Sequence, residues 1–159
     1  MHIQKWFALH NFFDEKNLAE ITKLTDDVAL TKARVISKNG KSLRNFLQRN
    51  CLSGWIHRDA KSDWLFKEIT NCVNEVNNRT LKFDLQDARK YSVSIQLSDE
   101  NDYVGGNLTI RGEGQSRYAP RGRGSIAVFP SHLLHQAKPV WIGKRKVIVA
   151  WIRGKKPLS

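Results

Sequence analysis

The sequence is poor in cysteine and has no long hydrophobic run, and each absence excludes a class of protein. Two cysteines, Cys51 and Cys72, can form neither a disulfide framework nor a four-ligand zinc site, so we expect two reduced thiols. No apolar run approaches the roughly 18 residues that a membrane span needs, and the N-terminal residues carry no secretory signal pattern. Together these absences predict a cytoplasmic protein.

Acidic residues are scarce in the last third of the chain. Residues 111–159 hold eleven Lys and Arg but a single acid, Glu113, so they carry +10 of the formal net charge of +12. This asymmetry indicates either a polyanionic partner, such as nucleic acid or an acidic protein, or a basic surface without a dedicated partner. Charge alone leaves both interpretations open, and no zinc-finger or helix-turn-helix signature decides between them.

The first half of the chain predicts two helices. Asp14 is a suitable N-cap for the first helix, whose apolar residues recur at helical spacing. Ser62 or Asp63 can begin the second helix, and Asn77–Asn78 ends it. The other features expected here are short strands at 5–13 and 52–56 and a turn at 37–41.

The second half changes to the period of strands. Residues 91–97 alternate between apolar and polar side chains, which is typical of a half-buried strand. Helices followed by several strands favour an α+β fold with an antiparallel sandwich or jelly roll. Further strands are expected at 107–110, 125–129 and 146–152. We therefore expect one domain over residues 1–159, with N-terminal helices and strands in 1–85 and jelly-roll strands in 89–153.

Three stretches of the second half carry a more specific pattern. They are Arg89 to Asp99 (RKYSVSIQLSD), Asp102 to Leu108 (DYVGGNL), and Gly124 to Trp151, which contains Phe-Pro-Ser at 129–131. In these stretches the sequence resembles the iron(II)- and 2-oxoglutarate-dependent dioxygenases, specifically their prolyl-4-hydroxylase-like, PKHD-type branch of bacteria and phages. The resemblance implies a double-stranded β-helix, a cupin-like jelly roll, with N-terminal helices packed on the sheet.

The same resemblance implies an activity and its cofactors. Enzymes of this family couple oxidative decarboxylation of 2-oxoglutarate to hydroxylation of a substrate. The resemblance implies that the substrate of this protein is a prolyl residue in a protein or peptide. Iron(II) and 2-oxoglutarate would be the cofactors, and ascorbate is a further candidate. Two His and one carboxylate hold the non-haem iron in such sites and leave positions open for co-substrate and oxygen.

Three residues match positions with a role in that family. His135 falls where the distal iron ligand is expected, whereas His132, three residues earlier, would face the other side of the same strand. Arg145, ten residues after His135, falls where the family places the cation for the distal carboxylate of 2-oxoglutarate. Trp151, on the strand face of Arg145, would wall the pocket, with ordinary core packing as the alternative.

The comparison also exposes a gap. The family's proximal His-x-Asp pair lies between the Phe83-Asp84-Leu85 strand entry and the strand that begins at Arg89, but only three residues separate them here. Three explanations are open: the sequence omits a mobile stretch, the protein is a natural or engineered deletion, or the site is rebuilt from other residues. We favour the first, because losing barrel strands would leave unpaired backbone groups.

One His-x-Asp triplet does exist, at His57-Arg58-Asp59, but it precedes the second helix instead of following it. It is either a decoy, with Asp59 starting the turn before the helix, or a displaced iron pair. If the proximal segment is truly absent, activity is in doubt. The alternative function is then an inactive dioxygenase-fold binding module whose basic C-terminal third contacts nucleic acid or an acidic protein.

Overall fold

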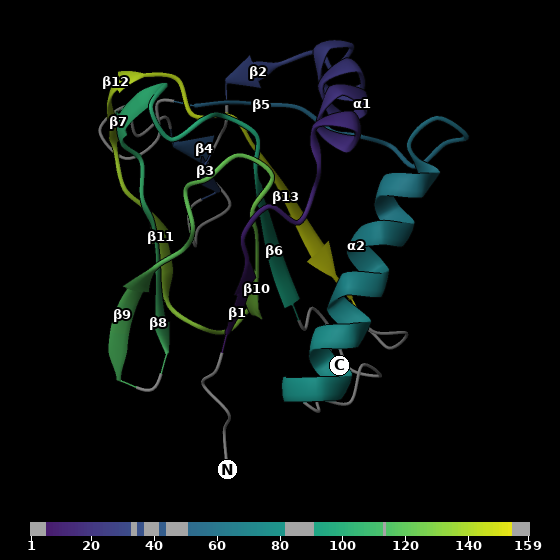
Figure 1. The fold of residues 1–159 in the computed structure, drawn as a ribbon. Helices are drawn as coiled ribbons and strands as arrows, with labels where there is room; N and C mark the ends of the chain where they lie inside the picture. Colours follow the sequence, from purple (N-terminus) through teal and green to yellow (C-terminus); the bar gives the residue numbers. More distant parts are fainter. Residues whose placement is uncertain are drawn as a thin grey trace.

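The structure is a computed structural model that describes residues 6–32, 35–36, 42–43, 51–81, 91–112 and 114–153. Two helices and a set of short strands make up this part of the chain (Figure 1). In chain order they are β1 Phe7–Leu9, α1 Glu15–Asp26, β2 Thr31–Lys32, β3 Val35–Ile36, β4 Ser42–Leu43, β5 Leu52–Ser53, α2 Asp63–Val76 with a π-type turn at Asn77–Leu81, β6 Tyr91–Gln96, β7 Tyr103–Gly105, β8 Leu108–Gly112, β9 Gln115–Tyr118, β10 Ile126–Pro130, β11 His135–Ala137, β12 Val140–Gly143 and β13 Val147–Ile152.

The largest sheet has the strand order β1-β10-β6-β13, and all of its pairs are antiparallel. Its central strand β6 pairs with β10 on one side and with β13 on the other, so that Ile95 lies opposite both Ile126 and Ile148. The sheet therefore joins segments that are distant in sequence, and β6 is the strand on which both neighbours depend.

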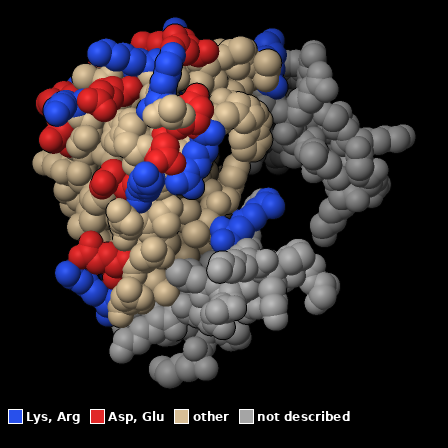
Figure 2. Space-filling model, turned by 90° about the vertical axis from the view of Figure 1, so that its right-hand side faces the viewer, with Lys and Arg blue, Asp and Glu red and all other residues tan. Residues whose placement is uncertain are grey.

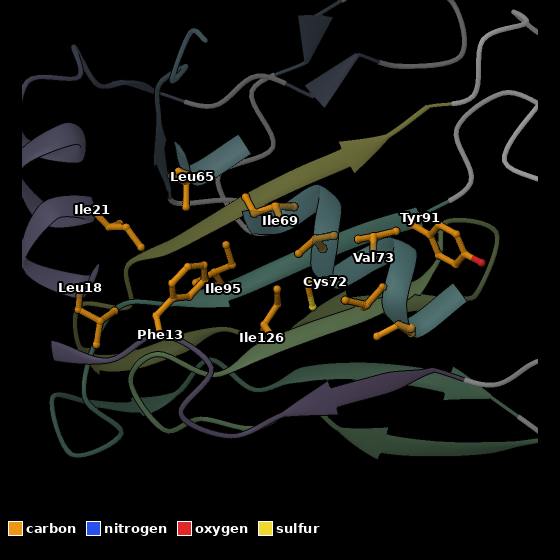
Figure 3. Close-up of a cluster of buried hydrophobic side chains, with 13 residues drawn as sticks. Phe13, Leu18, Ile21, Leu65, Ile69, Cys72, Val73, Tyr91, Ile95 and Ile126 are labelled. Atoms are coloured by element: carbon orange, nitrogen blue, oxygen red, sulfur yellow. The ribbon is translucent and has the colours of Figure 1, made fainter. Parts of the chain in front are cut away.

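Both helices pack against one face of this sheet. From β6 the side chains of Tyr91, Val93 and Ile95 have no exposed surface, and they belong to one apolar cluster with Leu18 and Ile21 of α1 (Figure 3). Helix α2 adds Leu65, Ile69, Cys72, Val73 and Val76 to the same cluster. Burying each large apolar side chain contributes about 1.5–3 kcal/mol, so this face is the main stabilising core.

The opposite face of the sheet meets a second layer. In Figure 1 strands β8, β9 and β11 lie on the far side of the sheet from the helices. They form a sheet of order β11-β8-β9, and β12 pairs with β7 beside it. A second apolar cluster fills the space between the layers, made of Leu108, Ile110, Ala119, Ala127, Phe129 and Leu133 with Trp6 packed against it. The four-stranded and three-stranded sheets thus form two facing antiparallel layers, and β2-β5 and β3-β4 are separate two-stranded pairs.

Most elements agree with the sequence-based expectations, and the differences have local causes. Asp14 caps α1 as predicted, because its carboxylate accepts a hydrogen bond from the backbone of Asn17 at 2.8 Å. A strand was expected at 5–13, but among the described residues of this range only Phe7–Leu9 form one. Asn11 has a positive φ of 51° and turns the chain after it. The strand expected at 52–56 pairs only over 52–53, with β2.

Two other expectations have different outcomes. The predicted turn at 37–41 lies outside the described residues. Strand β6 was expected to be half-buried, and this was wrong: its alternate residues Ser92 and Gln96 are as buried as the apolar ones. The polar face of β6 lies between the two layers, where the second sheet shields it from solvent. Among the described helices, none is long and apolar enough to cross a membrane.

Candidate functional site

The polar face of β6 is the starting point of the site. Because side chains alternate along a strand, Ser92, Ser94 and Gln96 point away from the helices and toward the second layer. Ser92 lies 3.0 Å from the hydroxyl of Ser131, at the end of β10. Gln96 is only 3% exposed. A buried amide must satisfy its hydrogen bonds within the protein, and its partners define the site.

Gln96 connects two residues that lie far from it in sequence. Its Nε2 donates to the hydroxyl of Tyr103 at 3.0 Å, and its Oε1 accepts a hydrogen bond from Nε of Arg145 at 3.2 Å. Tyr103 begins β7 and is 3% exposed. The expectation that Arg145 lies on the last strand is wrong, because β13 begins only at Val147. Arg145 instead occupies the link between β12 and β13.

The environment of Arg145 is unusual for a cation. Burial lowers its pKa from the ordinary value, while the neighbouring Tyr103 favours the charged form and Arg121 disfavours it. Among the described residues no carboxylate forms an ion pair with Arg145. A partly buried guanidinium without an acidic partner is a ready site for an anionic ligand, because buried charges are normally paired.

Gly106, the second glycine of the Asp102–Leu108 motif, makes room for this arginine. Gly106 has a φ of +67°, and a Cβ on it would lie 3.0 Å from Cδ of Arg145 and 3.1 Å from Cε2 of Tyr103. It would also lie 2.8 Å from Cγ2 of Val140. A side chain at this position would therefore press on Val140 and on the aliphatic part of Arg145, in addition to straining the backbone.

A second arginine, Arg121, holds Tyr103 in place. Arg121 lies over the ring of Tyr103, with its guanidinium carbon 4.5 Å from the ring centroid. Its Nη2 donates to the carbonyl oxygens of Glu100 at 3.0 Å and Tyr103 at 2.9 Å, and its Nη1 donates to Asn107 at 3.1 Å. We call the group of Gln96, Tyr103, Gly106 and Arg121 around Arg145 the Arg145 site.

His135 lies in a different environment. It begins β11 and is exposed, with its ring 4.9 Å from that of Phe129 on β10. Its Nδ1 is 2.7 Å from the carbonyl oxygen of Leu133, so this nitrogen carries the hydrogen and Nε2 remains for another contact. His132 lies in the turn that precedes β11, so the expected opposition of the two residues on one strand is wrong.

The His57-Arg58-Asp59 triplet has a structural role. The Asp59 carboxylate accepts hydrogen bonds from the backbone of Lys61 and Ser62, each at 2.9 Å, and the Ser62 hydroxyl donates to the carbonyl of His57 at 2.7 Å. The bonds from Ser62 lower the pKa of Asp59 most. Asp59 thus organises the turn that leads into α2, as the decoy interpretation expects.

An iron site needs two histidines and a carboxylate that converge. In the part of the chain that the structure describes, no group of three or more His, Cys, Asp or Glu lies close enough to hold a metal ion. His135 can contribute one nitrogen, but Asp59 is committed to the α2 turn. The described residues therefore do not fit a complete iron centre, whereas the chemistry of the Arg145 site suits a carboxylate.

Trp151 lies on β13 opposite Ser92, and so on the same face of the sheet as Gln96. It is 41% exposed, and its ring centroid is 6.2 Å from that of Trp55, which is 72% exposed. The two rings come from segments almost a hundred residues apart in the chain. The role of Trp151 as a pocket wall stays a prediction.

Several basic residues of the C-terminal third have intramolecular partners. Arg123 pairs with Glu15 and Lys146 with Asp26, each at 3.0 Å, so both connect this region to α1. On the face that carries the helices, Figure 2 shows Lys and Arg interspersed with Asp and Glu. These contacts give part of the basic charge a structural explanation that the sequence did not reveal.

Comparison with known proteins identifies the class. A sequence model of the 2OG-Fe(II) oxygenase superfamily matches residues 57–153, which is more than half of the chain. The protein therefore belongs to this superfamily. A PKHD-type hydroxylase of Idiomarina loihiensis is 36% identical over 62 residues, which cover 39% of this chain. That segment spans only 28% of the relative's length.

Solved structures show the same fold. A prolyl hydroxylase of Trichoplax adhaerens, in complex with a peptide fragment of the hypoxia inducible factor oxygen degradation domain, superposes with a TM-score of 0.72 at 14% identity. The match covers 96% of this chain and 84% of that one. A Pseudomonas putida prolyl-4-hydroxylase gives 0.58 at 13% identity, over 95% and 93% of the two chains. This likeness confirms the expected sheet-rich jelly roll with two helices.

Sequence reasoning missed four residues of the Arg145 site. Gln96, Tyr103 and Gly106 stand in the stretches that carried the family resemblance, but no role was assigned to them. Arg121 was interpreted as unassigned surface charge, whereas it holds Tyr103. The glycine pair at 105–106, two residues after Tyr103, was the one available signal, since it indicates a close approach of another group to the backbone.

Proposed function

We propose that the protein is a 2-oxoglutarate-dependent hydroxylase of prolyl residues in a protein or peptide. Its superfamily, the PKHD-type relatives and the prolyl hydroxylase folds support this proposal. The alternative, an inactive module that binds nucleic acid or an acidic protein, receives no support from these comparisons. The pairing of Arg123 and Lys146 with acids of α1 also weakens it.

The observation that carries the proposal is the partly buried cation Arg145, for which the described residues supply no carboxylate partner. The planar guanidinium can donate two parallel hydrogen bonds to one carboxylate, and burial strengthens such bonds. Arg145 would hold the distal carboxylate of 2-oxoglutarate, while the neutral partners Gln96 and Tyr103 keep the arginine in place. When bound, 2-oxoglutarate supplies the electrons that oxygen activation requires.

The remaining roles follow the resemblance. His135 would supply one imidazole ligand to iron(II), with its Nδ1 hydrogen bond to Leu133 fixing the ring. Trp151 would wall the pocket on the side of β13, and together with Trp55 it offers exposed aromatic surface to a prolyl ring. Because the described residues do not complete the iron centre, we derive no step at the metal. Ascorbate stays a prediction.

The experiment measures succinate formed from 2-oxoglutarate, with iron(II), ascorbate and a proline-containing peptide present. The unaltered protein should form succinate and add the mass of one oxygen atom to the peptide. Arg145→Ala should abolish turnover and leave the fold intact, and Arg117→Ala, at an exposed position of β9, is the matched control. No succinate from the unaltered protein, or unchanged succinate from Arg145→Ala, would contradict the proposal.

A further inference from the structure

We propose that Gln96 and Tyr103 are positioning residues that hold Arg145 with neutral acceptors, so that its charge stays available for a carboxylate ligand. The inference rests on the proposed function, because 2-oxoglutarate is the ligand for which the charge is kept. It goes further by assigning a role to two buried residues that do not carry charge themselves.

The hydrogen bonds around Gln96 fix the direction of its amide. Nε2 has two acceptors, the Tyr103 hydroxyl at 3.0 Å and the carbonyl oxygen of Ser98 at 3.2 Å. The amide oxygen must therefore point the other way, where it accepts from Nε of Arg145 at 3.2 Å. An amide in this orientation can hold an arginine by one donor and leave the terminal NH₂ groups of the guanidinium for another anion.

The hydroxyl of Tyr103, like the amide of Gln96, is a neutral group whose hydrogen bonds fix its position. It accepts the bond from Gln96, so its own hydrogen can be donated elsewhere. It lies beside the guanidinium and favours the charged form of Arg145. Arg121 clamps the ring from its other face and bonds the Tyr103 carbonyl oxygen at 2.9 Å. The hydroxyl is thus placed rigidly next to the cation.

Three other arginines of the described chain are held by carboxylates, whereas Arg121, like Arg145, bonds neutral acceptors. Arg58, Arg79 and Arg123 pair with the carboxylates of Asp63, Glu75 and Glu15 at 2.6, 2.8 and 3.0 Å. Those pairs are exposed, and each neutralises the arginine. Arg145 is the more buried cation, and a carboxylate at position 96 would bind it from within the protein. An amide supplies the same geometry without competing with a ligand.

The test titrates metal-free protein with 2-oxoglutarate and with succinate by calorimetry. Gln96→Glu is nearly isosteric, and it should form an internal ion pair with Arg145 and weaken both ligands at least about tenfold. Tyr103→Phe removes one hydroxyl and should weaken binding about fivefold. Tyr118→Phe, on the exposed strand β9, is the matched control and should bind like the unaltered protein.

Thermal unfolding of the same variants separates positioning from a merely structural role. A structural role would lower the unfolding midpoint together with affinity, whereas we expect Gln96→Glu to lose affinity and keep its midpoint. If Gln96→Glu does not fold, Tyr103→Phe decides alone. Unchanged affinity in the folded variants would overturn the inference. No binding by the unaltered protein would instead overturn the proposed function, so the two failures are distinguishable.

Discussion

The two halves of the candidate site differ in how completely the chain builds them. Arg145 is held by two side chains that are each 3% exposed, Gln96 and Tyr103, and Arg121 supports the second of them. His135 is exposed, and a single hydrogen bond to a backbone carbonyl orients it. The carboxylate half is therefore complete within the described residues, and the metal half is not.

The positions of the strands within their sheets, inner or edge, account for part of this contrast. Arg145 lies over the centre of the larger sheet, because Gln96 belongs to β6, which has a neighbour on each side. Among the described strands, β11 and β13 are each the edge of a sheet. His135 is on the first and Trp151 on the second, and both are exposed. Residues on edge strands have a neighbouring strand on one side only, so they are covered less than residues on inner strands.

The largest expected effect on stability comes from truncating a buried side chain of β6, the strand that supports the site. Ile95 is fully buried between the helices and the sheet, and Ile95→Ala should lower the free energy of unfolding by about 2–5 kcal/mol. Urea unfolding measures this loss. Val149→Ala, at a 48% exposed position of β13, should cost far less. Equal losses for the two variants would contradict the described core.

A second change acts directly on the Arg145 site. Gly106→Ala should cost about 1–3 kcal/mol and also weaken 2-oxoglutarate binding, since its Cβ meets Arg145 and Tyr103. Gly114→Ala is the matched control, because Gly114 also has a positive φ, +78°, but a Cβ there meets nothing within 4 Å. Calorimetry should show weaker binding only for Gly106→Ala. Equal binding by both variants would mean that Gly106 serves the turn and not the site.

The smallest effect is expected on the metal half. His135 is exposed, so His135→Ala should change the free energy of unfolding by less than about 0.5 kcal/mol. It should also leave metal-free binding of 2-oxoglutarate unchanged, because the Arg145 site does not include it. Calorimetry and urea unfolding check both statements. A marked loss of metal-free binding would show that the two halves are coupled.

The sequence predicted local features better than the contacts between distant segments. The capping of α1 by Asp14 and the alternation along β6 follow from neighbouring residues, and both were recognised. The buried polar face of β6 was not, because alternation cannot tell solvent from a second layer of strands. The assignment of Arg145 to a carboxylate ligand came from family resemblance and stays a prediction, and its place outside the strand was not predicted.

The partners of Arg145 show why the rest could not be predicted. Gln96 and Tyr103 reach Arg145, and Arg121 reaches Tyr103, only after β6, β7 and the link before β10 have folded together. No periodicity in the chain records such contacts, and a single sequence does not show which pairs vary together. In contrast, the commitment of Asp59 to the α2 turn follows from a local Asp-x-x-Ser pattern, and the sequence indicated it.

The central claim is that the Arg145 site binds a carboxylate through the protein alone. Calorimetric titration of the metal-free protein with 2-oxoglutarate tests it most directly, with Arg145→Met as the comparison. The account predicts saturable binding by the unaltered protein and a loss of affinity of about a hundredfold in Arg145→Met. Equal affinities, or no binding by the unaltered protein in the absence of metal, would contradict it.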